Sequence, residues 1–138
     1  MDGVRQIILD TNIVLDLLVF NDAATPPLRE ALQAGRLQWV ATAPMRDELE
    51  RVLAYPQIAK RLNFYGLSAA AVLQARDAQV QTLEVPPKAS VTCKDPDDQK
   101  FIDLAVAQRC TVLSKDQAVL CMEKRLLALG AYAQTAIK

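Results

Sequence analysis

Four acidic residues, far apart along the 138-residue chain, have the types and settings expected of ligands for a divalent metal ion: Asp10, Glu48, Asp98 and Asp116. Two unit charges 4 Å apart repel by about 4 kcal/mol at an effective dielectric constant near 20. Four carboxylates therefore share a pocket only if some are protonated or a cation neutralises them. One or two Mg²⁺ or Mn²⁺ ions would neutralise them, bind phosphate oxygens and lower the pKa of a bound water. The predicted chemistry is in-line attack by metal-activated water on a phosphodiester.

The composition removes several other kinds of site. The chain has no His, which excludes Ser-His-Asp and Cys-His nucleophiles, His-ligated zinc and histidine general bases. Its 16 basic and 16 acidic residues cancel, so any basic surface for nucleic acid must be local. The three cysteines lack a CxxC spacing, and we expect them to be reduced, with Cys110 and Cys121 packed as small hydrophobic residues. We find no signal peptide or membrane-spanning run and expect a cytoplasmic protein without a membrane partner.

Two of the acids follow short apolar runs that are typical of strands buried on both faces. Asp10 ends the run from Gln6, and Asp116 follows the run Thr111–Leu113 after Ser114 and Lys115. In open parallel sheets the carboxyl ends of the strands are where ligands bind. If these two strands are neighbours with their following helices on opposite faces, Asp10 and Asp116 face the crevice between them. The alternative for Asp116 is a plain helix cap.

The other two acids lie on predicted helices, where helical phase separates them from ordinary surface acids. In the helix 44–54, Glu48 falls at about −60° from Met45 and borders the apolar stripe. In the helix 98–108, Asp98 falls at about 60° from Phe101, within the buried arc, whereas Asp103 near 200° is expected to meet solvent or a salt bridge. The alternative for Glu48 is an exposed helix glutamate.

The remaining elements alternate between strands and helices. We predict strands at 6–12, 37–41, 82–85 and 110–114, a short edge strand at 132–137, and a loop at 88–97. Helices are predicted at 12–20, 26–34, 44–54, 56–62, 68–79, 98–108 and 117–129, with Asn12 and Ser68 as caps. This order predicts an α/β protein with a three-layer α/β/α Rossmann-like fold and a four- or five-stranded parallel sheet. We expect a single domain over residues 1–138, with Trp39 as a packing residue rather than a platform for a base.

With these residues placed, the sequence resembles the PIN-domain family of metal-dependent ribonucleases. The resemblance rests on Leu-Asp-Thr-Asn at 9–12, Asp-Glu-Leu at 47–49, Asp-Pro-Asp-Asp-Gln-Lys-Phe at 95–101 and Ser-Lys-Asp at 114–116. The Tyr55-Pro56 break followed by Gly66-Leu67-Ser68 is similar to the bacterial VapC-like toxins of toxin–antitoxin systems. One departure is the C-terminal end, which is short for a full final strand.

The resemblance implies a PIN-like fold, an acidic Mg²⁺/Mn²⁺ site and RNA as substrate. It assigns Asp10, Glu48, Asp98 and Asp116 to the catalytic and metal-binding positions, and Asn12 and Ser114 to supporting hydrogen bonds. It also implies a homodimer inhibited by a small antitoxin protein. Lys115 and Arg46 are the candidate RNA contacts, and the alternative for Lys115 is an ordinary exposed lysine. The pair Phe64-Tyr65 could stack bases or pack a helical hairpin or dimer surface.

Three rival functions remain open at this stage. A receiver-like phosphoacceptor domain needs paired acids after the first strand, where this chain offers only Asp10. A haloacid-dehalogenase-type phosphatase needs a second Asp two residues after the first, where Asn12 stands. A non-catalytic PIN-like module that binds RNA or protein would keep the fold without turnover, and the presence of all four acids argues against it.

Overall fold

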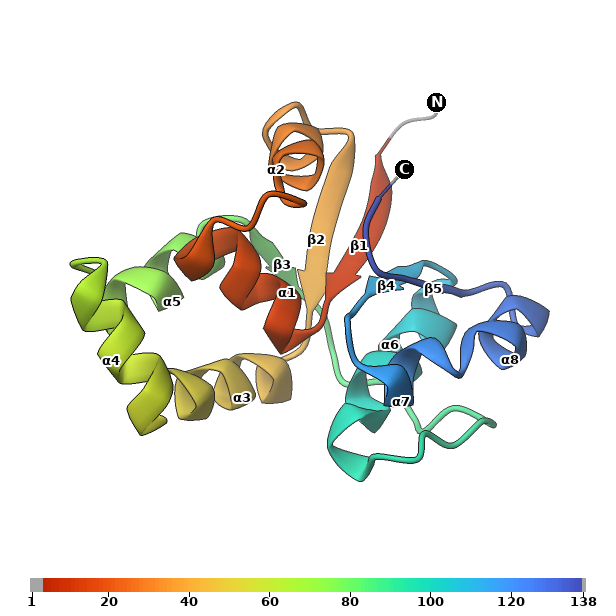
Figure 1. The fold of residues 1–138 in the computed structure, drawn as a ribbon. Helices are drawn as coiled ribbons and strands as arrows, with labels where there is room; N and C mark the ends of the chain where they lie inside the picture. The colour runs from red at the N-terminus through yellow and green to blue at the C-terminus, as the bar shows by residue number, and fades with distance from the viewer. Residues whose placement is uncertain (1–3, 138) are drawn as a thin grey trace.

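A parallel sheet of five strands forms the centre of the molecule, in the order β3-β2-β1-β4-β5 (Figure 1). The computed structural model describes residues 4–137, so residues 1–3 and 138, the ends of the predicted domain, lie outside the described residues. The strands are β1 (Arg5–Leu9), β2 (Leu37–Ala41), β3 (Val80–Thr82), β4 (Thr111–Leu113) and β5 (Tyr132–Gln134). The predicted α/β fold is confirmed, and the sheet has the larger of the two predicted strand numbers.

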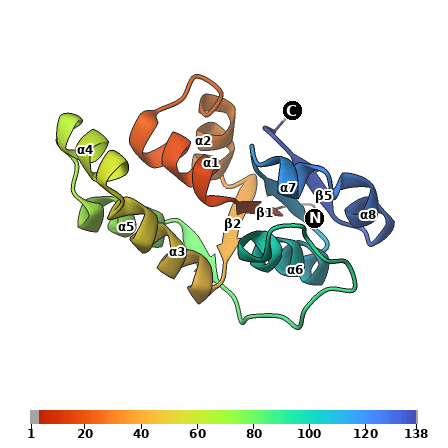
Figure 2. The same ribbon diagram turned by 60° about the horizontal axis from the view of Figure 1, so that its bottom comes forward.

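The helices divide into two groups on either side of the sheet (Figure 2). One group comes from residues 11–77: α1 (Thr11–Leu15), the π-helix η1 (Asp16–Phe20), α2 (Pro26–Gln33), α3 (Ala43–Leu53), α4 (Pro56–Phe64) and α5 (Ala69–Asp77). The other group comes from residues 96–128: the 3-10 helix η2 (Pro96–Asp98), α6 (Gln99–Gln108), α7 (Gln117–Leu120) and α8 (Glu123–Ala128). Among residues 4–137, no helix is long and apolar enough to cross a membrane.

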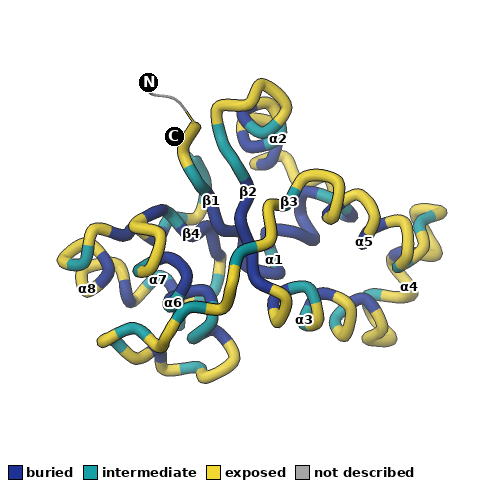
Figure 3. Tube along the Cα trace, turned by 180° about the vertical axis from the view of Figure 1, so that it is seen from behind, coloured by how far each residue is buried: buried dark blue, intermediate teal, exposed yellow. Residues whose placement is uncertain are grey.

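Alternate strand residues bury into two separate hydrophobic clusters, as expected for a sheet covered on both faces. Ile8 packs with Phe101 and Met122 on the side of α6 to α8. Leu9 and Trp39 pack on the other side, among residues of α1, α3 and α5. Trp39 is 1 % exposed, so its predicted role as a packing residue is confirmed. Figure 3 shows the same contrast, with the centre of the sheet buried and the outlying α4 mostly exposed.

The order of the strands reverses between β1 and β4, which lie side by side with Ile8 opposite Val112 and Leu9 opposite Leu113. From β1 the chain moves outward to β2 and β3, then returns across the sheet through α6 to β4 and β5. The amide of Asp10 continues this pairing with a 2.9 Å hydrogen bond to the carbonyl of Leu113. This predicted switch point is where open α/β sheets bind ligands. The order also differs from the 2-1-3-4-5 order typical of receiver domains, which removes that rival.

Several predicted element boundaries are wrong. The first strand, predicted at 6–12, ends at Leu9, and the edge strand predicted at 132–137 ends at Gln134. The strand predicted at 82–85 is β3 (Val80–Thr82), because β2 ends at Ala41 and leaves residues after Leu83 without a strand to pair with. The helix predicted at 117–129 breaks between α7 and α8, since the chain turns there to lay α8 against α6 and β5. The first helix begins at Thr11 rather than after Asn12, because Asp10 is its cap.

Two predictions about single residues also need correction. Cys121, which we expected to be packed, is exposed because it lies in the turn between α7 and α8. Cys93 is buried. Cys110 is buried as predicted, and this burial raises its thiol pKa to about 12. Asp103 is half-buried, and it forms no salt bridge within residues 4–137. It accepts hydrogen bonds from the amide of Ala89 and the Gln99 side chain, because the loop before α6 folds back over that helix.

Candidate metal centre

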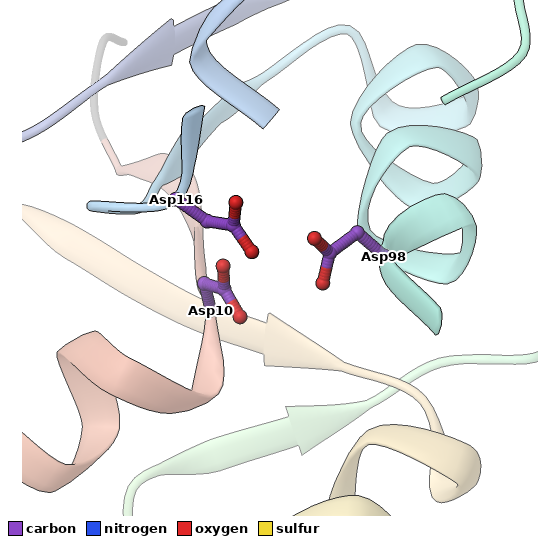
Figure 4. Close-up of side chains that lie close together, drawn as sticks. All are labelled: Asp10, Asp98 and Asp116. Carbon is purple, nitrogen blue, oxygen red and sulfur yellow. The ribbon is translucent and has the colours of Figure 1, made fainter. Parts of the chain in front are cut away.

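Three of the four predicted acids converge at the carboxyl end of the sheet. Asp10 follows β1 and caps α1, Asp116 caps α7 two residues beyond Ser114, and Asp98 ends η2 at the start of α6. One carboxylate oxygen from each lies within 4.8 Å of the others, and Figure 4 shows all three side chains directed into a common space. Three elements far apart in sequence therefore present their charges at one point.

Asp10 is nearly inaccessible to solvent and is held in place by two hydrogen bonds. Its Oδ1 accepts from the amide of Thr11 at 2.7 Å, and its Oδ2 accepts from the Ser114 hydroxyl at 2.5 Å. Burial raises the pKa of Asp10 above its ordinary value, the two hydrogen bonds oppose this, and the charges of Glu48 and Asp116 add to the rise. The side chain is thus fixed in position, and its negative charge is destabilised by burial and by the neighbouring acids. A bound cation would relieve this destabilisation.

Asp98 gives the clearest indication that the cluster could bind a cation. Its side chain is buried, yet its Oδ2 has no hydrogen-bond partner among the described residues. Burial, the adjacent Asp116 carboxyl and the charge of Asp10 together raise the pKa of Asp98 to about 8. A buried carboxylate oxygen without a donor is costly, and a metal ion or a proton would satisfy it. The three oxygens fit the oxygen ligands preferred by Mg²⁺ and Mn²⁺.

Asp116 is both a helix cap and a member of the cluster. The cap that we considered as an alternative role for Asp116 is therefore compatible with its role in the site. Its Oδ1 accepts from the amide of Ala118 at 2.9 Å. Its own amide donates to the Ser114 hydroxyl at 2.9 Å, which ties it to the residue that holds Asp10. The cap fixes the side chain in a direction that also serves the site.

Glu48 lies beside the three aspartates without joining their close group. Its Oε2 accepts a 2.5 Å hydrogen bond from the Thr11 hydroxyl, and its Oε1 forms an ion pair with Lys100. The side chain is 17 % exposed, which fits the predicted position at the border of the apolar stripe of α3. Both oxygens are therefore engaged by groups other than the aspartates.

The two predicted supporting residues differ in what they contact. Ser114 is fully buried, donates to Asp10 and accepts from the amide of Asp116, so it links two members of the cluster. The Oδ1 of Asn12 accepts a hydrogen bond from the amide of Lys115 at 3.4 Å. Asn12 thus holds the chain that leads to Asp116 rather than a carboxylate.

The two candidate RNA contacts are each paired with another acid. The ammonium of Lys115 lies 2.5 Å from Asp16, although the Lys115 side chain is still 49 % exposed. Arg46 donates to Asp77 on α5 through two nitrogens, at 3.0 Å each. Neither cation is paired with the three clustered aspartates in this structure.

Sequence reasoning missed the parts that Thr11 and Asp16 play, and it placed Lys100 near the acids without naming its partner. Thr11 and Lys100 bind Glu48, and the buried Asp16 pairs with Lys115. The position of Thr11 between Asp10 and Asn12 was a usable signal, because the end of the first strand carries a hydroxyl as well as a carboxylate. Nothing in the local sequence joins Lys100 to Glu48, since they lie on different helices.

Two surface hollows, of about 580 and 710 Å³, lie at the opposite end of the strands and include none of the four acids. Both are lined by Val4, at the amino end of β1. The carboxylate cluster therefore lies at the rim of the sheet, outside these two hollows. A rim of this kind suits an extended substrate better than a small molecule enclosed in a cavity.

The fold and the cluster define a class: a three-layer α/β protein that gathers carboxylates at its topological switch point. The family model described as PIN domain matches residues 6–118. The chain therefore belongs to the PIN-domain family, in agreement with the resemblance of its four acidic motifs.

Comparison with solved structures supports the same fold. One similar chain comes from the crystal structure of VapBC2 from Rickettsia felis bound to a DNA fragment from their promoter. It has a TM-score of 0.64 and 10% sequence identity, covering 93% of this chain and 96% of that chain. Comparison with curated proteins finds no match.

Proposed function

We propose that this protein is an endoribonuclease that depends on Mg²⁺ or Mn²⁺ and hydrolyses RNA phosphodiester bonds. The observation that carries the proposal is the buried carboxylate of Asp98, which lies in a close group with Asp10 and Asp116 and whose Oδ2 has no hydrogen-bond partner among the described residues. Membership of the PIN-domain family supports the nuclease class. A bound divalent ion would bind a phosphate oxygen and lower the pKa of a water molecule.

The residues have distinct proposed roles around this chemistry. Asp10, Asp98 and Asp116 would hold the ion, and Ser114 would orient Asp10 through its hydroxyl. Glu48 would complete the acidic rim, fixed by Thr11 and Lys100. Asn12 would support the segment that carries Asp116.

We also propose that the protein is the toxin of a toxin–antitoxin pair, acting on RNA in the cytoplasm as a homodimer. The name of the similar VapBC2 complex and the family membership support a protein partner. Exposed aromatic side chains on and beside α4 offer apolar surface for one: Tyr55, Phe64 and Tyr65 are 47%, 84% and 43% exposed. Size-exclusion chromatography with light scattering tests the dimer, and mixing with the product of an adjacent small gene tests the antitoxin.

Cleavage of a mixed RNA substrate with Mn²⁺ tests the enzyme activity. We expect Asp98→Asn and Asp10→Asn to lower the cleavage rate by at least on the order of 100-fold, because ligand loss removes the ion. Asp97→Asn is the matched control, since Asp97 is adjacent and exposed. Equal cleavage by all four proteins would point to a contaminating nuclease and defeat the proposal.

Metal binding is measured separately by thermal unfolding without RNA. An ion present at 100 times its Kd stabilises the folded protein by about 2.7 kcal/mol, so Mn²⁺ should raise Tm by on the order of 10 °C. This rise should disappear in Asp98→Asn and persist in Asp97→Asn. Mn²⁺ and RNA binding without cleavage would favour the non-catalytic alternative.

A further inference from the structure

We propose that Lys100 is a built-in second cation, so that the centre binds a single divalent ion on the three aspartates. Its ammonium pairs with Glu48 Oε1, a carboxylate oxygen that a second ion at Glu48 would need as a ligand. This inference rests on the metal centre of the proposed function and adds its stoichiometry and the role of Lys100.

Lys100 is held at the rim by contacts from several directions. It lies in the first turn of α6, two residues after Asp98, and its side chain is only 21 % exposed. Its ammonium contacts Glu48 Oε1 and the carbonyl of Asp97, and lies 5.1 Å from the centre of the buried Phe101 ring. A lysine held in this way is a fixed positive charge rather than a mobile surface group.

Glu48 and Asp98 differ in how many of their carboxylate oxygens have a hydrogen-bond or ion-pair partner. At Glu48 both oxygens are already satisfied, one by Lys100 and one by the Thr11 hydroxyl. At Asp98 one buried oxygen has no hydrogen-bond partner within residues 4–137. A divalent ion is therefore needed among the aspartates, and a second ion at Glu48 would have to displace Lys100.

The charges favour the same arrangement. Four carboxylates carry four negative charges, and one divalent ion plus the Lys100 ammonium supply three positive charges. One negative charge remains. A second divalent ion beside Lys100 would be repelled by it, and the repulsion is twice that between two single charges at the same distance. Removing the ammonium would remove this repulsion and leave Glu48 as a free ligand.

The test counts Mn²⁺ ions bound per chain, by isothermal titration and by electron paramagnetic resonance of unbound Mn²⁺, with no RNA present. We expect the wild type to bind a single ion and Lys100→Met to bind a second. Lys100→Gln should behave like Lys100→Met, which guards against a folding defect in either variant. Lys100→Arg keeps the charge and should bind a single ion. Circular dichroism confirms that each variant is folded.

Two further variants separate a local effect from a general change in charge. Lys124→Met removes a charge from the exposed face of α8 and should leave a single ion bound. In Lys100→Met combined with Glu48→Gln the second ion should be lost again, because its carboxylate ligand is gone. Return to a single ion in this double variant would place the second site at Glu48.

Two results would overturn the inference while leaving the metal centre intact. They are two ions bound by the wild type, or a single ion bound by both Lys100→Met and Lys100→Gln. No Mn²⁺ binding by the wild type would overturn the metal centre itself, and the inference with it.

Discussion

The hydroxyl of Ser114 donates a 2.5 Å hydrogen bond to Oδ2 of Asp10, although 104 positions separate these residues along the chain. The pairing of β1 with β4 brings them together, because both residues follow the last paired positions of neighbouring strands. The same hydroxyl accepts from the amide of Asp116. One buried side chain therefore sets the position of two members of the acidic cluster.

Ser114→Ala should weaken the metal centre as well as the fold. Loss of a hydrogen bond to a charged group costs about 1.5–3 kcal/mol, and loss of a residue that orients a ligand lowers metal affinity by about 10–100-fold. Calorimetric titration with Mn²⁺ measures the affinity. Ser68→Ala is the matched control, since Ser68 caps α5 through an exposed hydroxyl. That variant should lose about 1 kcal/mol of stability with unchanged Mn²⁺ affinity. Equal affinities in both variants would contradict an orienting role for Ser114.

The metal-free protein should lose stability as pH rises. The pKa of Asp98 is about 8 in the folded protein against an ordinary value of 3.8, so the folded state holds more protons than the unfolded state between these values. The free energy of unfolding therefore falls as pH increases through this range, and the penalty is complete above about pH 8.

Urea unfolding at pH 5 and pH 9 in the presence of a chelator measures this dependence. Asp98→Asn should flatten it, because the amide does not ionise, and should be the more stable protein at pH 9. Saturating Mn²⁺ should reduce the dependence in the wild type, since the ion replaces the proton. An Asp98→Asn variant with the same pH dependence as the wild type would show that another group is responsible.

Lys115→Gln should weaken RNA binding if the lysine contacts phosphate. The half-exposed ammonium can leave Asp16 for a phosphate oxygen, so we expect a higher KM and a slope of log affinity against log salt that is lower by about 1. Arg46→Gln should have a smaller effect, because Asp77 already takes two of its donors.

The rival role for Lys115 is purely structural, through its pair with Asp16. In that case Lys115→Gln and Asp16→Asn would lower the free energy of unfolding by similar amounts. The slope of log RNA affinity against log salt would stay at the wild-type value. Lys124→Gln removes a remote charge and controls for the net charge of the chain. Filter binding at several salt concentrations separates these outcomes.

The sequence alone determined the parts of the site that depend on local pattern. Asp10 and Asp116 follow short apolar strands, and parallel strands end at a common edge, so their position was predictable without coordinates. Asp98 was predictable because its helical phase places it on the buried side of α6. The parallel sheet with helices on both faces followed from the alternation of strands and helices, whereas the adjacency of β1 and β4 came from the structure.

Only the tertiary structure decided which polar groups pair with one another. Glu48 bonds to Thr11 and Lys100, and Lys115 pairs with Asp16, through contacts between elements that the sequence does not join. The short β3 and the break after α7 also depend on neighbours, because a strand ends where its partner strand ends and a helix turns where packing requires it. Periodicity fixes the face on which a side chain lies. Its partner depends on which long side chains from other elements can reach it in the folded protein.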